Sequence, residues 1–224
     1  MQSIRIVFVV ACLAVVATTR LSAQGFNGVI QFVSYENANH PDTMTQLTKG
    51  SKIRFEGMGK DNGAMIMDGT TRLILLTDQK KYMEMPENLG AREATEEGSK
   101  HHGVAEKTGK TEVVAGVPCN VWHYKGTKSN GSAEEGEACI ARGTGFMINR
   151  LSGGMVGSYF NAGGAAFATE MKNGGGIMKV TENGKLSLVA VKVQATSVPD
   201  AMFAPPPGYT KMDMGSMRGP PRKP

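Results

Sequence analysis

Residues 107–124 read KTGKTEVVAGVPCNVWHY, and this stretch decides the fold that the sequence predicts. It contains the only tryptophan of the chain, Trp122, and one of its three cysteines, Cys119. An apolar run up to Ala115 is followed by a Gly-Val-Pro turn and by a second run that ends at Tyr124. Two such runs joined by a turn are typical of a β-hairpin, so we expect paired strands over 111–115 and 119–124.

Short apolar runs also fill the sequence before this hairpin. In Lys52–Glu56, Ile53 and Phe55 alternate with charged residues, which is the pattern of a strand with one buried face. Turn sequences such as Asp61-Asn62-Gly63 separate these runs, so the segment is predicted to be an antiparallel meander. Its strands are expected at residues 26–35, 44–48, 52–56, 64–68, 72–77 and 80–85.

After the hairpin, residues 135–141 are predicted to form a return strand. Helical character is expected over Phe146–Leu151 and Ala165–Met171, around a glycine-rich segment at 152–164. Strands follow at 177–181 and 186–196, joined by an Asn183-Gly184 turn. In the last of these strands, alternation places Val189, Val191 and Val193 on one face.

The domain boundaries follow from composition. We expect a signal peptide over residues 1–23, a single domain over 24–210, and a disordered tail of Met, Gly, Pro and Arg over 211–224. The charged segment 87–110 inside the domain is predicted to be a loop, or a short helix over 91–97. No segment beyond residue 23 approaches the roughly 18 apolar residues that a membrane-spanning helix needs.

The N-terminal segment predicts export. Arg5 precedes the apolar run from Ile6 to Ala17, and Ala23 offers a small residue for cleavage. The alternative is a lipoprotein signal with lipidation at Cys12, which lies early in the apolar run. We expect a periplasmic or secreted protein.

The two cysteines that remain after cleavage, Cys119 and Cys139, are predicted to form a disulfide, because an even pair in an oxidising compartment usually does so. A metal or catalytic role is the alternative, and it is disfavoured because no second cysteine lies at metal-ligand spacing from either. No metal site and no cofactor are predicted.

Charge and motifs argue against nucleic-acid binding and catalysis. The formal charge of +5 falls to +3 without Arg5 and Arg20, and the tail carries the remaining excess, so the folded body is close to neutral. The sequence contains no zinc-protease, nucleophile-elbow, P-loop or dinucleotide motif. Cys119 and His123 lie about 13 Å apart along a strand, beyond hydrogen-bond reach. We predict that the protein is not an enzyme.

Methionine is unusually frequent, with 15 residues in the chain. Met65 and Met67, and Met83 and Met85, form Met-x-Met pairs whose side chains share one face of a strand, as in a core or a ligand cavity. Thioethers also suit Cu(I), so copper handling is an alternative, with the tail methionines and the His101-His102 pair as further ligands. The tail methionines are Met212, Met214 and Met217.

Sequence blocks spread along the chain form a recognisable set. They include FNGVI at 26–30, KIRFE at 52–56, MIMD at 65–68, KYME at 81–84, and KTGK at 107–110 with VAGVPC at 114–119. The last of them are VPDAMF at 198–203 and Pro-Gly-Tyr at 207–209. With these blocks the chain resembles a known bacterial family, the domain of unknown function 4412. In outline the chain is also similar to the periplasmic lipoprotein carriers (LolA/LolB-like) and related lipid-binding lipoproteins.

The resemblance implies a mainly β, β-rich α+β fold: a strongly curved, incompletely closed antiparallel sheet with a glycine-rich helical segment over its concave face. We expect that face to hold a lipid, an acyl chain or another apolar ligand. A third reading is an envelope protein that binds other proteins and has no small ligand. The apolar cavity is expected to be lined by Ile53, Phe55, Met83, Met85, Val189 and Val191.

Overall fold

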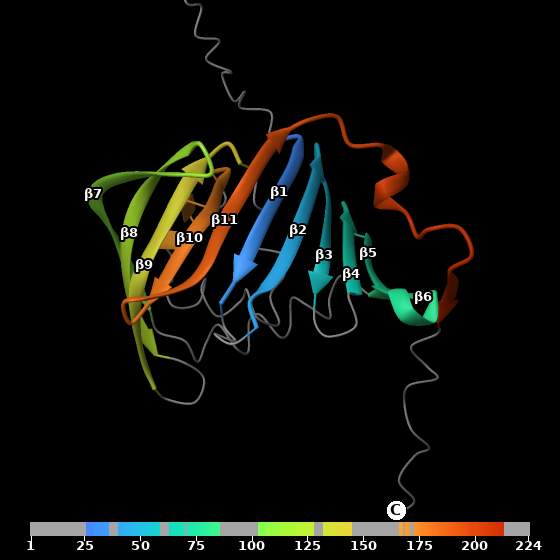
Figure 1. Ribbon diagram of the computed structural model, residues 1–224, viewed down its shortest axis with the longest axis horizontal. Coiled ribbons are helices and arrows are strands. Elements are labelled where there is room, and N and C mark those ends of the chain that lie inside the picture. The colour runs from blue at the N-terminus through green and yellow to red at the C-terminus, as the bar shows by residue number, and fades with distance from the viewer. Residues whose placement is uncertain are drawn as a thin grey trace, which may run out of the picture.

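The computed structural model describes residues 26–35, 40–58, 63–69, 71–85, 103–127, 132–144, 166–167, 169–170 and 173–212. These residues form one 12-stranded sheet together with two short 3-10 helices (Figure 1). The strands are β1 Gly28–Ser34, β2 Asp42–Lys49, β3 Lys52–Met58, β4 Gly63–Asp68, β5 Thr71–Leu76, β6 Lys81–Met85, β7 Val104–Val114, β8 Val117–Thr127, β9 Ala133–Arg142, β10 Gly175–Glu182, β11 Lys185–Ala195 and β12 Thr210–Met212. The helices are η1 Thr77–Gln79 and η3 Asp200–Phe203.

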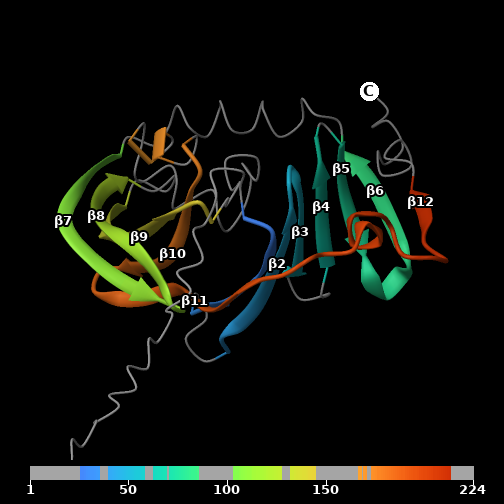
Figure 2. The ribbon, with the colours of Figure 1, turned by 90° about the horizontal axis from the view of Figure 1, so that it is seen from above.

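The sheet consists of two meanders that meet at its centre. The strand order is β12-β6-β5-β4-β3-β2-β1-β11-β10-β9-β8-β7, and β1 pairs with β11 to join the halves. Among the described strands every pairing is antiparallel except that of β12 with β6, which is parallel. The sheet is curved, and β12 and β7 are its two edges (Figure 2).

Tight turns with positive φ angles set the register of two hairpins. Asn183 and Gly184 join β10 to β11 with φ angles of 48° and 75°, and Ala115 and Gly116 join β7 to β8 with 49° and 79°. Positive φ at both central residues matches the twist of a two-residue hairpin. The predicted turn at 116–118 is therefore placed at Ala115-Gly116, and β8 begins at Val117.

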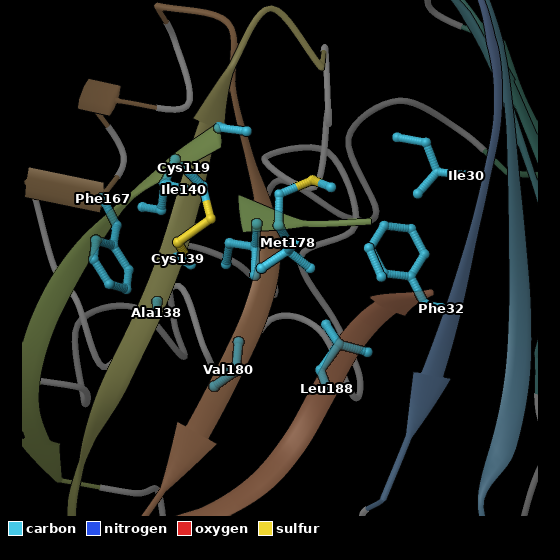
Figure 3. Close-up of a cluster of buried hydrophobic side chains, with 14 of the residues drawn as sticks. Ile30, Phe32, Cys119, Ala138, Cys139, Ile140, Phe167, Met178, Val180 and Leu188 are labelled. Atoms are coloured by element: carbon cyan, nitrogen blue, oxygen red, sulfur yellow. A yellow bond between two sulfur atoms is a disulfide. The ribbon is translucent and has the colours of Figure 1, made fainter. Parts of the chain in front are cut away.

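The sheet has a core on each of its faces, which we call inner and outer. The inner face carries Ile30, Phe32, Ile53 and Phe55, which belong to the larger cluster of buried side chains (Figure 3). The outer face carries a second cluster formed by Val29, Leu47, Ala64, Ile66, Leu73, Leu75, Val198 and Phe203. Most strands of the N-terminal meander are therefore apolar on both faces, as strands buried on both sides are.

The C-terminal segment covers the outer face. It leaves β11 at the centre of the sheet and reaches the edge, where β12 pairs with β6 (Figures 1 and 2). Phe203 of η3 enters the outer cluster, and Arg54 donates a hydrogen bond of 3.0 Å to the carbonyl oxygen of Met202. Asp200 pairs with Lys49 at 2.7 Å and with Lys52 at 3.6 Å.

The hairpin of β7 and β8 folds back over the sheet. Glu112 of β7 reaches Lys179 of β10 at 2.8 Å, although β8 and β9 lie between these strands in the sheet. The disulfide between Cys119 of β8 and Cys139 of β9 is present, with the two Cα atoms 5.4 Å apart, so that prediction is confirmed (Figure 3). It connects neighbouring strands, as expected from the hairpin.

The predicted helical segment over the concave face is wrong. The elements of the described residues are the strands of a single sheet and the short helices η1 and η3, and neither of these helices falls within the predicted helical ranges. Ala166, Phe167, Thr169 and Glu170 have helical backbone, but they amount to one turn whose role is to insert Phe167 into the inner core. Phe146–Leu151 and the segment 152–164 lie outside the described residues. A mainly β fold is what remains of the prediction.

Two boundaries also differ. β7 begins at Val104, so the last part of the predicted loop 87–110 is strand, and residues 87–102 lie outside the described residues. The sequence conceals this strand because charged and hydroxyl side chains occupy most of its positions. β12 includes Lys211 and Met212, which were predicted to begin the tail. A three-residue strand is too short to show a period in sequence.

Candidate functional site

A row of side chains crosses the inner face of the N-terminal meander. Cross-strand pairing aligns Gln46 with Phe55, Phe55 with Met65, Met65 with Ile74, Ile74 with Met83, and Met83 with Met212. Residues that stand opposite each other in paired strands point to the same side of the sheet. The row therefore runs from β2 to β12 on one face.

A second row lies beside the first, one step of two residues further along each strand. It aligns Ile53 with Met67, Met67 with Arg72, and Arg72 with Met85. Leu73 and Leu75 lie between these positions in β5 and belong to the outer cluster, which confirms that Arg72 and Ile74 point inward. Both Met-x-Met pairs thus share the inner face, as predicted from their spacing.

The part of this surface on β4, β5, β6 and β12 is a methionine-rich patch that we call the methionine face. Met67 is buried and the other members are half-buried. Beyond Met65 and Met67, its side chains belong to neither cluster of buried residues. The methionine face consists of Met65, Met67, Ile74, Met83, Met85 and Met212.

Four of the six predicted cavity residues share the inner face. Ile53 and Phe55 are core side chains with exposed fractions of 1% and 6%, whereas Met83 and Met85 lie on the methionine face. Val189 packs against the larger cluster but stands opposite Val33 on the other face of the sheet, and Val191 is 50% exposed. The two valines therefore do not share the inner face with the other four.

A β-bulge explains the position of the valines. The register between β1 and β11 shifts between Gln31 and Phe32, so Phe32 pairs with Ala190 and Ile30 pairs with Val193. Val191 is the extra residue, and alternation before and after it has opposite phase. The side chains on the inner face of β11 are consequently Leu188, Ala190 and Val193.

Two cations lie on the inner face beside the methionines. Arg72 stands between Met67 and Met85, and Lys81 lies opposite Leu76 at the start of β6. Both are half-buried. Sequence reasoning missed Arg72 because both faces of β5 are apolar; its place opposite two methionines appears only once the register is known.

Gln46 is a buried polar group at the inner end of the first row. Its amide nitrogen donates a 2.9 Å hydrogen bond to the hydroxyl of Thr48, while its carbonyl oxygen is buried without a hydrogen-bond partner. The side chain is fully buried, so this acceptor sits within the core rather than on the methionine face.

A depression lies in the C-terminal half of the sheet, away from the methionine face. It has a volume of about 340 Å³ and is lined by His123, Glu135, Gly136, Glu137, Thr181, Asn183 and Gly184. Glu135 contacts Lys125 at 3.1 Å and His123 at 2.9 Å, and these two groups hold the pKa of its carboxyl below the ordinary value. The group is solvent-exposed, and Cys119 is in a disulfide, so this trio is a surface ion-pair cluster rather than an activated nucleophile.

No metal cluster or membrane helix lies in the described part of the chain. Those residues contain no group of three or more His, Cys, Asp and Glu placed to hold a metal ion. They also contain no helix long and apolar enough to cross a membrane.

Comparison with known proteins gives a family. No curated protein matches the chain. One solved structure that matches the chain is that of an uncharacterized conserved protein from Thermus thermophilus, at 9% sequence identity and a TM-score of 0.46; the match covers 82% of this chain and 88% of that one. The family model for a domain of unknown function, DUF4412, matches residues 26–209. Because this match spans most of the sequence, the chain belongs to the DUF4412 family.

Proposed function

We propose that the protein is a non-enzymatic, exported binding module whose methionine face holds an apolar ligand, such as a lipid or an acyl chain. The observation that carries the proposal is a set of half-buried apolar side chains on neighbouring strands, Ile74, Met83, Met85 and Met212, which belong to neither core cluster of the described residues. Apolar side chains that are not part of the core are available to contact an apolar ligand.

The composition of the face suits a flexible ligand. Met65, Met83 and Met212 lie in one cross-strand row with Ile74 among them. Methionine is unbranched and polarizable, so its side chain adapts to irregular apolar shapes. The row spans three strand spacings, about 14 Å, which provides an elongated surface.

The location part of the proposal rests on the disulfide and the N-terminal sequence. Disulfides persist in oxidising compartments such as the periplasm. The Cys119–Cys139 bond is compatible with export. As part of the same proposal, the protein carries its apolar ligand in a way similar in outline to the LolA-like lipoprotein carriers.

Charge favours the apolar ligand over copper. The Met-x-Met pairs present thioethers on one face, and thioethers suit Cu(I). Arg72 and Lys81 lie on that same face, however, and their charge repels a bound cation. We therefore propose an apolar ligand; copper handling is the competing hypothesis.

The test is ligand recovery and probe binding. Native mass spectrometry and lipid extraction of the protein purified after export should find bound lipid, and Nile red should bind with a blue-shifted emission. Met83→Glu places a charge in the first row and should abolish probe binding. The matched control is Val113→Glu, at an exposed position of β7, which should leave binding unchanged.

Two results would oppose the proposal. The absence of bound lipid together with no Nile red binding would favour an envelope protein that binds other proteins. Probe binding that is insensitive to Met83→Glu would place the apolar site elsewhere.

A further inference from the structure

Arg72 is a cation inside an apolar row. Its neighbours across the strands are Met67 on β4 and Met85 on β6, and Ile74 is next to it along β5 on the same face. The side chain is half-buried. A guanidinium that is partly removed from water needs a counter-charge or hydrogen-bond acceptors.

No such partner of Arg72 lies among the residues that the structure describes. Within them its guanidinium takes part in no hydrogen bond and no ion pair. The other two arginines of these residues are paired: Arg54 contacts Glu56 at 2.8 Å, and Arg142 contacts Glu170 at 3.0 Å. Arg72 is therefore the exception among the arginines that the structure describes.

The acidic residues of the same strands all lie on the other face. Glu56 stands opposite Ala64, Glu84 opposite Leu73, and Asp68 follows the same alternation as Ile66, so all three carboxylates point outward. On the outer face these carboxylates form ion pairs with cationic side chains: Lys52–Asp68, Arg54–Glu56 and Lys211–Glu84. On the inner face of strands β3 to β6, the charged side chains are therefore all positive.

We propose that the ligand of the methionine face is an acyl chain with a carboxylate head group, a long-chain fatty acid, and that Arg72 binds the carboxylate. This inference rests on the proposed function and adds the chemical class of the ligand. The hydrocarbon chain contacts Met65, Ile74, Met83 and Met212, and the head group lies in the second row beside Met67 and Met85.

A single guanidinium matches a monoanionic head group. Arginine presents paired N–H donors whose geometry fits the two oxygens of a carboxylate. Lys81 lies four residues from Met85 along β6, about 13 Å, so it does not share the head group with Arg72. The head-group site therefore carries a single positive charge, and the single negative charge of a carboxylate balances it.

The experiment compares dodecanoate with 1-dodecanol, which has the same chain without the charge. Each is titrated against protein loaded with Nile red, and its affinity is read from displacement of the dye. The wild-type protein should bind dodecanoate more tightly than 1-dodecanol. Arg72→Gln should weaken dodecanoate binding by roughly tenfold to a hundredfold and leave 1-dodecanol binding unchanged, because only the charge-assisted hydrogen bonds are lost.

Two further variants isolate the role of position 72. Arg72→Lys keeps the charge without the fork of donors and should restore part of the dodecanoate affinity. Lys192→Gln removes one positive charge from an exposed position on the other face and should change neither affinity. Nile red binding to each variant shows that the face is still folded.

The outcomes separate this inference from the proposed function. Equal binding of dodecanoate and 1-dodecanol, with no effect of Arg72→Gln, would overturn the inference and leave an apolar site. Binding of dodecyl phosphate but not of dodecanoate would overturn the choice of carboxylate. A protein that binds neither compound nor Nile red would overturn the proposed function, and the inference with it.

Discussion

Arg72 on β5 stands directly opposite Met85 on β6, on the face of the sheet that is turned away from the outer cluster. The alternation of β5 places Leu73 and Leu75 in that cluster and leaves Arg72 and Ile74 to the methionine face. One strand thus contributes both to the stability of the fold and to the proposed binding surface. The predictions below concern first the stability of the fold and then the proposed binding surface.

The disulfide should contribute substantially to stability. Cys119 and Cys139 close a loop with a sequence separation of 20 residues, and the chain-entropy model assigns about 3 kcal/mol to a loop of that size. Replacing both residues by alanine should lower the free energy of unfolding in urea by about this amount. An unchanged midpoint and slope of the urea transition would contradict the prediction.

Phe167 should be a main support of the inner core in the C-terminal half. Its ring is fully buried, with its centroid 5.8 Å from that of Trp122 and 5.9 Å from that of Tyr124, both in edge-to-face geometry. Phe167→Ala should cost about 3–5 kcal/mol of unfolding free energy, since burial is lost and a cavity is left. Phe167→Leu is the milder control.

The single tryptophan gives this variant an optical signal. Loss of the Phe167 ring should expose Trp122 and shift its fluorescence emission to longer wavelength. Unchanged emission and stability in Phe167→Ala would show that this one turn of chain does not cover the core.

Gly136 is required by close packing between strands. A Cβ atom at this position of β9 would lie 2.0 Å from the carbonyl oxygen of Thr181 and 2.7 Å from the hydroxyl oxygen of Tyr124. Gly136→Ala should therefore destabilise the protein by about 3 kcal/mol, because a backbone atom of the neighbouring strand must move. Gly184→Ala is the control: it meets no atom within 4 Å and tests only the strain of a positive φ angle. Equal thermal midpoints of the two variants would contradict the steric account.

Asp200 should make the C-terminal segment sensitive to acid. The hydrogen bond from Lys49 is the largest cause that holds the pKa of the Asp200 carboxyl below its ordinary value of 3.8. A carboxyl whose folded pKa is depressed contributes stability that is present above the unfolded value and is lost as pH falls through the folded one. The contribution should therefore decline as the pH falls below about 4, and it should be small because the pair is exposed.

Asp200→Asn is the variant that checks this. It should be slightly less stable than wild type at pH 6, and this difference in unfolding free energy should shrink as the pH falls below 4. A difference between the two proteins that is larger at pH 3 than at pH 6 would contradict the assignment. Lys192→Gln, which involves no carboxyl, should show no such pH dependence.

The sequence predicts the strands well where one face is apolar. Ile53 and Phe55 alternate with charged residues, and β3 forms around them with those two side chains in the core. The disulfide and the Asn183-Gly184 turn were predictable for similar reasons, since each depends on local chemistry. The helical segment was suggested by apolar residues at a spacing of four between β9 and β10, but most of that connection lies outside the described residues, which show helical backbone there only at 166–167 and 169–170.

The site depends on relationships that alternation alone does not give. The bulge in β11 reverses the phase that placed Val189 and Val191 with the cavity residues. The parallel pairing of β12 with β6, which brings Met212 beside Met83, joins segments more than a hundred residues apart and has no local signal. Met83 and Met85 could be assigned to one face because a spacing of two is sufficient for that.

The most direct test of the central claim is methyl NMR of the protein labelled with 13C at the methionine ε-methyl groups. Titration with dodecanoate should shift the signals of Met83, Met85 and Met212, and leave that of Met202, which packs against the outer cluster, in place. Met→Leu substitutions assign each signal. Binding of dodecanoate that shifts Met202 while Met83, Met85 and Met212 remain unchanged would contradict the claim that the methionine face is the binding site.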